Sequence, residues 1–202
     1  MAKGNRDIIL RDRLQFDVAA TTGNVNLVYG RVDLSDYVSI VRNEGLAIKE
    51  IRFQFRDPAS SLPFPVWMNT EDPNGLSTLA VNEASIRVFA TTTAYELAQD
   101  VGIASPNVIC MMERINTTTI TGTAPNASFS VGEYKENWYG TPDLHPEGYD
   151  VVTDLLIGVT ANGLLNTRLE GTTQELDIMI IAEPKKITSK DLTQMLTQAQ
   201  DL

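Results

Sequence analysis

The sequence predicts an all-β protein, an antiparallel β-sandwich of about eight to ten strands with little helix. Three observations support this class. Apolar and polar residues alternate in short runs along most of the chain. Turn-rich segments such as TTGN at 21–24 and DPNG at 72–75 separate the runs. The runs also follow one another without intervening helices, which argues against a Rossmann or β/α-barrel fold.

The composition suits one domain with a real core. The chain has 202 residues, 43% of them hydrophobic, and no apolar run as long as a membrane-spanning helix. The N-terminal segment carries charges where a signal peptide needs an apolar stretch, so no signal peptide is expected. A formal net charge of −10 makes the chain self-repelling and a poor generic binder of nucleic acid.

Period-two patterns define the strands of the first half of the chain. The runs at 14–18 and 25–29 flank the TTGN turn, and each has three apolar residues at alternate positions: Leu14, Phe16 and Val18, then Val25, Leu27 and Tyr29. The run at 51–56 places Ile51, Phe53 and Phe55 inward and Arg52, Gln54 and Arg56 outward. Further strands are expected to begin at Phe64, Ile86, Val108 and Phe129.

Two later runs are more apolar. The segment VVTDLLIGVT at 151–160 is nearly continuous, so we expect it to be covered on both faces. The run from Glu175 places one set of side chains on one face and a smaller set on the other: Leu176, Ile178 and Ile180, then Met179 and Ile181. The single cysteine, Cys110, lies in the apolar run VICMM and is expected to be a core residue.

Two helices are expected. A short helix near 35–42 would have Ser35 as its N-cap and Gly45 as its left-handed stop. A C-terminal helix would begin after Thr188, which with Asp191 resembles a capping box. Its apolar stripe consists of Leu192, Met195 and Leu196. An isolated helix this short is marginal in water, so the stripe must dock on its own sandwich or on a neighbour.

These patterns divide the chain into an N-terminal arm at 1–13, a β-sandwich domain at 14–184 and a C-terminal helical arm at 185–202. We expect the arms to order mainly on assembly. The candidate subunit contacts are Arg52, Arg56, Leu192, Met195 and Leu196. Three lysines near the last helix could answer acidic groups on a neighbouring subunit: Lys185, Lys186 and Lys190.

The basic residues of the N-terminal arm are Lys3, Arg6, Arg11 and Arg13. They make a weak case for contact with nucleic acid or anionic lipid headgroups, and a solvated tail is the alternative.

The sequence contains no enzyme signature. The one histidine, His145, lies in a turn and cannot build a multi-histidine metal site, and the nucleophile-elbow, phosphate-loop and zinc-protease motifs are absent. We therefore expect no catalytic residues, no bound transition metal and no cofactor. The acids Asp143, Glu147 and Asp150 fall in one loop, where a calcium site and solvated carboxylates both remain open.

One stretch suggests a carbohydrate site. Tyr134, Trp138 and Tyr139 lie close to Glu133 and Glu136, and aromatic rings stack on sugar faces while carboxylates accept hydroxyl hydrogen bonds. The same mixture also suits a cross-strand surface or a subunit contact.

The strand, capped-helix and strand pattern of VDLSDYVSIVRNEGLAIKEIRFQFRD, with the closing series from DVVTDLLIGVTANG to ELDIMIIAEP, resembles the single jelly-roll capsid proteins of icosahedral viruses. The resemblance implies a jelly-roll sandwich and a structural virion subunit that self-assembles in many copies into an icosahedral shell. It implies assembly in the host cytoplasm, and partners that are further copies, other capsid proteins or an underlying membrane. It carries over no site residues.

Many small capsid proteins have a strongly basic arm that neutralises the genome, and this chain lacks one. This departure argues against direct genome packaging. The alternative function is a non-catalytic jelly-roll carbohydrate-binding module.

Overall fold

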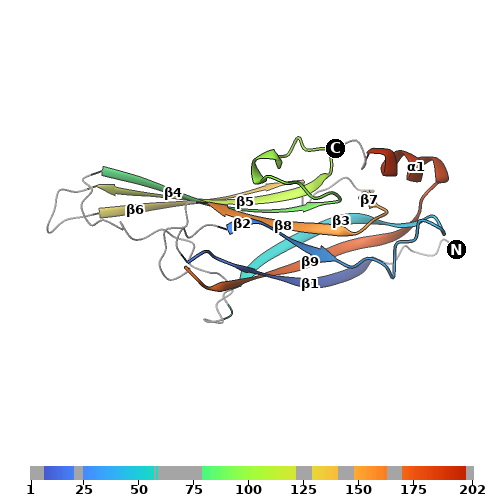
Figure 1. Ribbon diagram of the computed structural model, residues 1–202, viewed down its shortest axis with the longest axis horizontal. Coiled ribbons are helices and arrows are strands. Elements are labelled where there is room, and N and C mark those ends of the chain that lie inside the picture. Colours follow the sequence, from blue (N-terminus) through green and yellow to red (C-terminus); the bar gives the residue numbers. More distant parts are fainter. Residues whose placement is uncertain are drawn as a thin grey trace.

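The computed structural model shows two antiparallel β-sheets packed face to face (Figure 1). It describes residues 7–20, 25–56, 58, 79–121, 129–140, 148–162 and 170–198. The antiparallel sandwich predicted from the sequence is confirmed. The strand expected from Phe64 lies outside these residues.

One sheet has four strands, in the order β1 (Ile8–Asp17), β9 (Thr173–Lys186), β3 (Glu44–Arg56) and β7 (Tyr149–Val151). The other has five, in the order β2 (Val25–Val32), β8 (Leu155–Asn162), β4 (Leu79–Thr91), β5 (Val108–Thr121) and β6 (Phe129–Tyr139). The helices of the described residues are a 3-10 turn (Ala98–Asp100) and α1 (Ser189–Gln198). Neither has the length and hydropathy needed to cross a bilayer.

The strand pairings are nested, as in a jelly roll. β1 pairs with β9, β2 with β8, and β3 with β7, and all of these enclose the β4–β5 pair. β6 is an added strand beyond β5. Without β6, eight strands form two four-stranded sheets in this order, which is the jelly-roll arrangement. β1 and β2 therefore lie in different sheets, and TTGN does not connect a hairpin.

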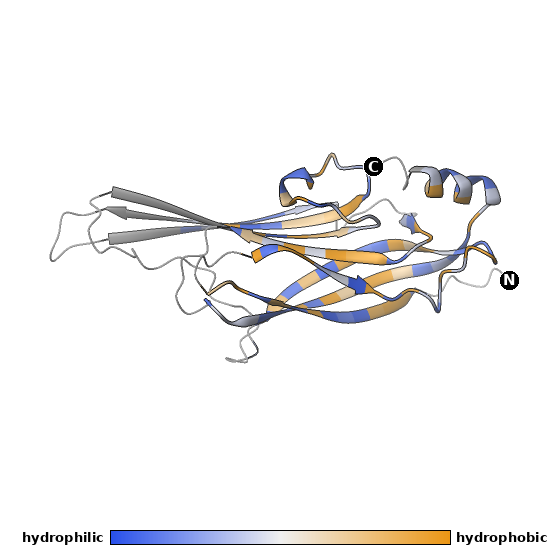
Figure 2. Cartoon of the chain, in the orientation of Figure 1, coloured by the Kyte–Doolittle hydropathy of each residue, from blue (hydrophilic) through white to orange (hydrophobic). Residues whose placement is uncertain are grey.

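The core lies between the two sheets. Its inward residues from β3 are Ile51, Phe53 and Phe55, and those from β9 are Leu176, Ile178 and Ile180, as the alternation predicted. The outward residues Arg52 and Gln54 are exposed. Figure 2 shows hydrophobic stretches along the strands of the sandwich. Cys110 is buried in this core, which confirms its expected role.

A second apolar cluster covers the outer face of the five-stranded sheet. It is built from Phe89, Val101 and Met111, with Leu27 and Tyr29 packed against it. The prediction that β2 presents one apolar face is wrong, because a bulge between Val25 and Val28 shifts the alternation. Val25 therefore reaches the main core, while Leu27 and Tyr29 reach the outer cluster.

β8 is covered on both faces, as its continuous apolar run indicated. Leu155, Ile157 and Val159 point into the main core. On the other face the ring of Phe89 lies directly over Gly158, where any Cβ would overlap it. Only glycine fits at this crossing of β8 and β4.

The helix expected near 35–42 is not formed. Tyr37 and Val38 donate backbone hydrogen bonds to the carbonyl of Leu34, which gives a single turn. The chain then folds back through a second turn that is closed by a β-bridge between Ser39 and Glu44. The adjacent β-branched residues of this turn disfavour helix, and the bridge satisfies the backbone groups instead. The left-handed residue is Asn43, with φ of 53°, and Gly45 belongs to β3.

The expected boundary of the N-terminal arm is also wrong. Residues 8–13 belong to β1, which pairs with β9 from Ile8 to Asp17. The polar stretch Arg11–Asp12–Arg13 hid the alternation of Ile8 and Leu10 with the later core residues of the strand. Residues 1–6 lie outside the described part of the chain.

Three strands continue beyond the sandwich. β8 pairs with β4 only over residues 85–91, whereas β5 pairs with β4 from Leu79 onward and β6 pairs with β5 along its whole length. Figure 1 shows β4, β5 and β6 projecting as a three-stranded ribbon past the end of the other strands.

Candidate interaction surfaces

The outer face of the four-stranded sheet carries four arginines. Arg11 and Arg13 come from β1, and Arg52 and Arg56 from β3. The register places Arg11 and Arg52 on either side of Met179 in β9. Two sets of basic residues that the sequence placed in an arm and in a contact face are thus brought onto one surface, which we call the arginine face.

Most of these arginines are paired with carboxylates of the same sheet. Arg13 Nε donates to Asp177 Oδ1 at 2.6 Å, and this hydrogen bond raises the pKa of Arg13. Arg56 lies 3.8 Å from the other Asp177 oxygen, and Arg52 pairs with Glu50. Arg11, which is exposed, has no ion-pair partner among the described residues.

The arginine face is a mixed surface rather than a phosphate-binding track. Carboxylates alternate with the guanidinium groups, so a nucleic acid backbone would meet repulsion as well as attraction. A shallow hollow of about 790 Å³ lies on this face, lined by Arg11, Arg52 and Met179 among others. Half-buried apolar groups beside charges of both signs are typical of a protein-contact surface.

The aromatic residues of β6 do not form one platform. Tyr134 and Trp138 lie on the same side of the strand, but Trp138 is partly buried and packs against the main core, where its ring stacks on Phe53. Tyr139 points to the other side and joins the outer cluster with Met111. The three proposed sugar contacts are therefore split between two faces, because adjacent residues of a strand point in opposite directions.

Glu136 of β6 is the centre of a polar cluster that joins β6 to β5. Its carboxylate accepts hydrogen bonds from Tyr134 Oη at 2.7 Å, Trp138 Nε1 at 2.7 Å and Arg114 Nε at 2.6 Å. Arg114 also lies over the ring of Phe55, 5.2 Å from its centroid. The groups hold one another in place, so this cluster fixes β6 to the sandwich.

The pKa values of the cluster follow from this geometry. Burial alone would raise the pKa of Glu136, but hydrogen bonds from Trp138 and Tyr134 and the charge of Arg114 together lower it. Burial and the hydrogen bond to Glu136 raise the pKa of Tyr134 to about 12. The carboxylate stays ionised and the phenol stays neutral at neutral pH.

The C-terminal helix docks on its own sandwich. Thr188 caps α1, since its Oγ1 accepts from the Asp191 backbone N–H at 3.2 Å. Leu192 is buried against Val152 and Ile187, and Met195 and Leu196 pack against the same cluster. Of the two docking sites that the sequence left open, the chain's own sandwich holds Leu192, and a contact of Met195 and Leu196 with a neighbouring subunit stays a prediction.

The lysines before the helix also have partners within the chain. Lys185 Nζ lies 2.7 Å from Asp150, and Lys186 Nζ lies 2.8 Å from Glu44. The hydrogen bond from Lys186 lowers the pKa of Glu44. These two lysines therefore tie β9 to β7 and β3 and need no acidic neighbour, while Lys190 is exposed on α1.

Several candidate residues lie outside the described part of the chain: Lys3, Arg6, Asp143, His145 and Glu147. The calcium hypothesis therefore stays a prediction. Within the described residues, no group of three or more His, Cys, Asp or Glu side chains could hold a metal ion.

A polar hollow of about 880 Å³ lies on the outer face of the five-stranded sheet. Its lining includes Asn26 of β2, Asn162 of β8 and the segment from Glu96 to Gln99. Arg87 crosses its floor and donates to Glu113 Oε1 at 2.7 Å and to the carbonyl of Val101 at 2.8 Å. Sequence reasoning missed this hollow, because its lining comes from residues far apart in the chain.

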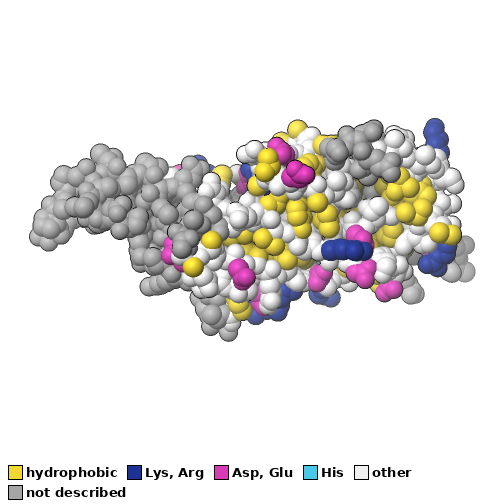
Figure 3. Space-filling model, viewed as in Figure 1, with side chains coloured by type: hydrophobic (Ala, Val, Ile, Leu, Met, Phe, Trp, Pro, Cys, Tyr) yellow, Lys and Arg dark blue, Asp and Glu magenta, His cyan; other side chains and the backbone are white. Residues whose placement is uncertain are grey.

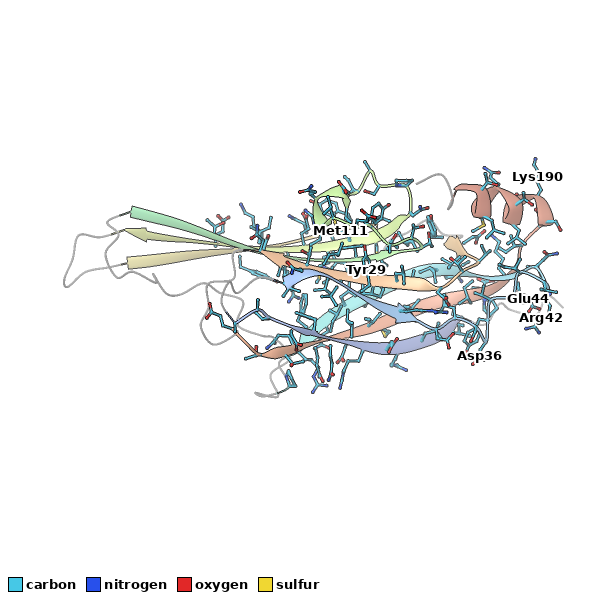
Figure 4. All side chains as sticks on the ribbon, in the orientation of Figure 1. Tyr29, Asp36, Arg42, Glu44, Met111 and Lys190 are labelled. Carbon is cyan, nitrogen blue, oxygen red and sulfur yellow. The ribbon has the colours of Figure 1, made fainter. Side chains whose placement is uncertain are left out.

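A rigid apolar turn also escaped sequence analysis. Ile40 and Val41 are 48% and 95% exposed, at the tip of the turn between Ser39 and Glu44. This turn lies at the end of the sandwich where Figure 4 labels Asp36, Arg42 and Glu44. The adjacent β-branched residues were assigned to a helix, so their outward position was not foreseen.

Fold and surfaces together define a jelly-roll protein whose polar clusters serve structure and whose exposed features suit contact with other molecules. No family model and no curated protein matches the chain.

Solved structures with a similar chain trace include viral capsid proteins. VP1 of Trichodysplasia spinulosa-associated polyomavirus has 6% identity and a TM-score of 0.32, over 92% of this chain and 97% of that chain. The unassembled VP1 pentamer of Merkel cell polyomavirus has 10% identity and a TM-score of 0.30 over the same shares. The resemblance to jelly-roll capsid proteins is thus found again. At these values it carries no argument about function, and the fold assignment rests on the strand order.

Proposed function

We propose that this protein is a structural, non-catalytic shell subunit that associates with further copies of itself, as the capsid subunit of a virion does. The proposed assembly is an icosahedral shell in the virion. The partners are further copies, with other shell proteins or a membrane beneath the shell as additional neighbours.

The observation that supports this proposal most is the ribbon of β4, β5 and β6. Over residues 79–84 of β4 the backbone pairs with β5 on one side only, beyond the end of β8, among the strands that the structure describes. The free edge of a strand presents backbone N–H and C=O groups that another chain can pair with. We infer that the ribbon gains such a partner from a neighbouring subunit of the shell.

Sedimentation velocity and negative-stain electron microscopy of the purified full chain test the proposal. We expect closed particles or ordered multimers that form as the protein concentration rises. A compact monomer at all concentrations and salt conditions would reject the shell function.

A second candidate function is a carbohydrate-binding module, and the polar hollow on the five-stranded sheet favours it. Amide and hydroxyl groups of Asn26, Asn162 and Thr160 line it beside Glu96, and such groups can bond to sugar hydroxyls. A glycan-array screen followed by calorimetry tests this function. A Gln99→Ala or Asn162→Ala variant should lose any binding that the screen detects, whereas Tyr134→Phe should retain it.

A further inference from the structure

The turn that displays Ile40 and Val41 is held rigidly. Ser39 and Glu44 exchange backbone hydrogen bonds, both at 2.9 Å, and the Ile187 N–H donates to the carbonyl of Asn43 at 2.9 Å. Lys186 Nζ binds Glu44 and also donates to the carbonyl of Arg42. The tip is therefore already ordered, so little conformational entropy is lost when another molecule covers it.

The base of this turn is anchored in the core. Leu34 is fully buried, and Tyr37 and Val38 pack against the main core. The other apolar residues of this segment are thus buried or packed on the core, whereas Ile40 and Val41 remain exposed. Single exposed apolar residues are ordinary, but a fixed, adjacent pair of β-branched side chains forms a preformed knob.

One carboxylate beside the knob is unpaired. Asp36 is exposed and makes no hydrogen bond or ion pair within the described part of the chain. Its neighbours are otherwise satisfied, since Asp33 accepts from the Ser35 N–H at 2.9 Å and Arg42 pairs with Glu44 at 3.2 Å. The knob therefore presents two aliphatic groups beside one free negative charge.

The arginine face offers the complementary arrangement. Its hollow has Met179 as an apolar element, flanked in register by Arg11 and Arg52. Arg11 is the guanidinium without an ion-pair partner among the described residues. Ile9 and Ile181 extend the apolar part by one row, and Ile9 is 50% exposed.

We propose that the Ile40–Val41 turn of one copy inserts into the hollow of the arginine face of a second copy, with Asp36 facing Arg11. The proposal rests on the self-association proposed above and names its contact. The partner is a second copy because the two surfaces of this one chain complement each other: Asp36 beside the knob and Arg11 on the arginine face are exposed, opposite charges without ion-pair partners among the described residues.

The contact joins the end of one sandwich to the outer face of another, so it is head-to-tail. Contacts of this type close into rings or extend without limit, and rings are the units from which closed shells are built. Figure 3 shows basic and acidic side chains together along the lower margin of the described part, which is the side of the four-stranded sheet of β1, β9 and β3.

Disulfide trapping tests the geometry directly. In a Cys110→Ala background, which removes the one native thiol, the Val41→Cys protein is mixed with the Met179→Cys protein and oxidised. A covalent dimer should form in this mixture and not from either variant alone, because the contact is head-to-tail. The matched control replaces Met179→Cys by Ile103→Cys, a site that is 68% exposed and outside the contact.

Association strength gives an independent readout. The double variant Ile40→Ser/Val41→Ser should weaken self-association by roughly tenfold or more, because apolar burial is lost. The control Leu97→Ser/Ile103→Ser removes a similar exposed apolar pair and should leave association unchanged. Arg11→Glu and Asp36→Lys should each weaken association, and their combination in one chain should restore it.

The outcomes separate the two proposals. If the wild-type protein associates and neither the trapping nor the knob variant shows an effect, the contact is wrong while self-association stands. Trapping of Val41→Cys with itself would also overturn the contact, because it would show a two-fold symmetric interface. A wild-type protein that stays monomeric overturns both proposals.

Discussion

The indole ring of Trp138 stacks on the phenyl ring of Phe53, with ring centroids 6.0 Å apart and planes 11° from parallel. Trp138 lies in β6, the strand added at the edge of the five-stranded sheet, and Phe53 lies in β3 of the facing sheet. This stack therefore packs the two layers against each other, in the part of the sandwich where β8 still pairs with β4.

The Trp138→Ala substitution should destabilise the subunit by about 2–4 kcal/mol. This value overlaps the range for fully buried aromatic residues and extends below it, because Trp138 is only partly buried. The stack with Phe53 and the hydrogen bond to Glu136 are both lost. Urea unfolding followed by circular dichroism measures the change in the free energy of unfolding.

A double-mutant cycle with Phe53→Leu isolates the stack, which should contribute about 0.5–1.5 kcal/mol of coupling. Additive effects of the two substitutions would show that the rings do not interact energetically.

The Glu136→Gln substitution should remove the part of the free energy of unfolding that depends on ionisation of Glu136. The folded-state pKa of Glu136 is lowered below its ordinary 4.5, so its stabilisation is present above that pH and is lost as pH falls through the folded value. Urea midpoints of wild type and variant should therefore differ at neutral pH and converge in strong acid.

The matched control for Glu136 is Glu133→Gln, since Glu133 is more exposed and pairs with Lys135 on the surface. We expect little change from this variant. An equal acid response in both variants would contradict the assignment to Glu136.

The Tyr134→Phe substitution should remove the latest tyrosine ionisation. The pKa of Tyr134 is raised to about 12, so its phenol should titrate after an ordinary tyrosine does. The folded state then holds a proton that the unfolded state has lost, so stability falls as pH rises from about 10 toward 12. Alkaline difference spectroscopy measures this titration, and loss of an early-titrating tyrosine instead would refute the expectation.

The Gly158→Ala substitution should destabilise by about 1–3 kcal/mol through overpacking. The new methyl group would overlap the ring of Phe89, which lies over this position. Thermal unfolding compares it with Gly102→Ala, where no atom lies within 4 Å of the added Cβ. Equal stability of the two variants would show that the ring moves aside without cost.

The Leu192→Ala substitution should destabilise the subunit by about 2 kcal/mol, at the lower end for buried leucine because the site lies near the surface. Leu192 is 7% exposed and packs on Val152 and Ile187. Native-state hydrogen exchange should show faster exchange in α1. Lys190→Ala, on the exposed side of the helix, should leave exchange unchanged, and a neutral Leu192→Ala would mean that α1 is not docked.

The alternation of apolar residues determined the all-β class and most of the inward faces. The inward triplets of β3 and β9, and the core position of Cys110, follow from local patterns in which each side chain's direction depends on its own strand. The capped C-terminal helix was also predictable from the sequence, because the Thr188–Asp191 cap and the apolar stripe at Leu192 lie within one short segment.

The local sequence pattern gave the wrong secondary structure where pairing with a segment distant in the sequence decided the conformation. Residues 8–13 become a strand because β9 offers a pairing edge, although Arg11 and Arg13 make the segment look like a solvated arm. Residues 35–43 become two turns because the Ser39–Glu44 bridge and contacts with Ile187 replace helical hydrogen bonds.

The contact surfaces were decided by tertiary structure alone. Arg11 and Arg52 are far apart in the sequence and become neighbours only because β1 and β3 both pair with β9. Tyr134, Trp138 and Tyr139 are close in sequence and are separated because a strand alternates its faces. The sequence by itself determined the all-β class and the apolar sides of strands such as β3 and β9. The nested pairing of those strands, a long-range choice set by the burial of two facing sheets, decided which residues share a surface.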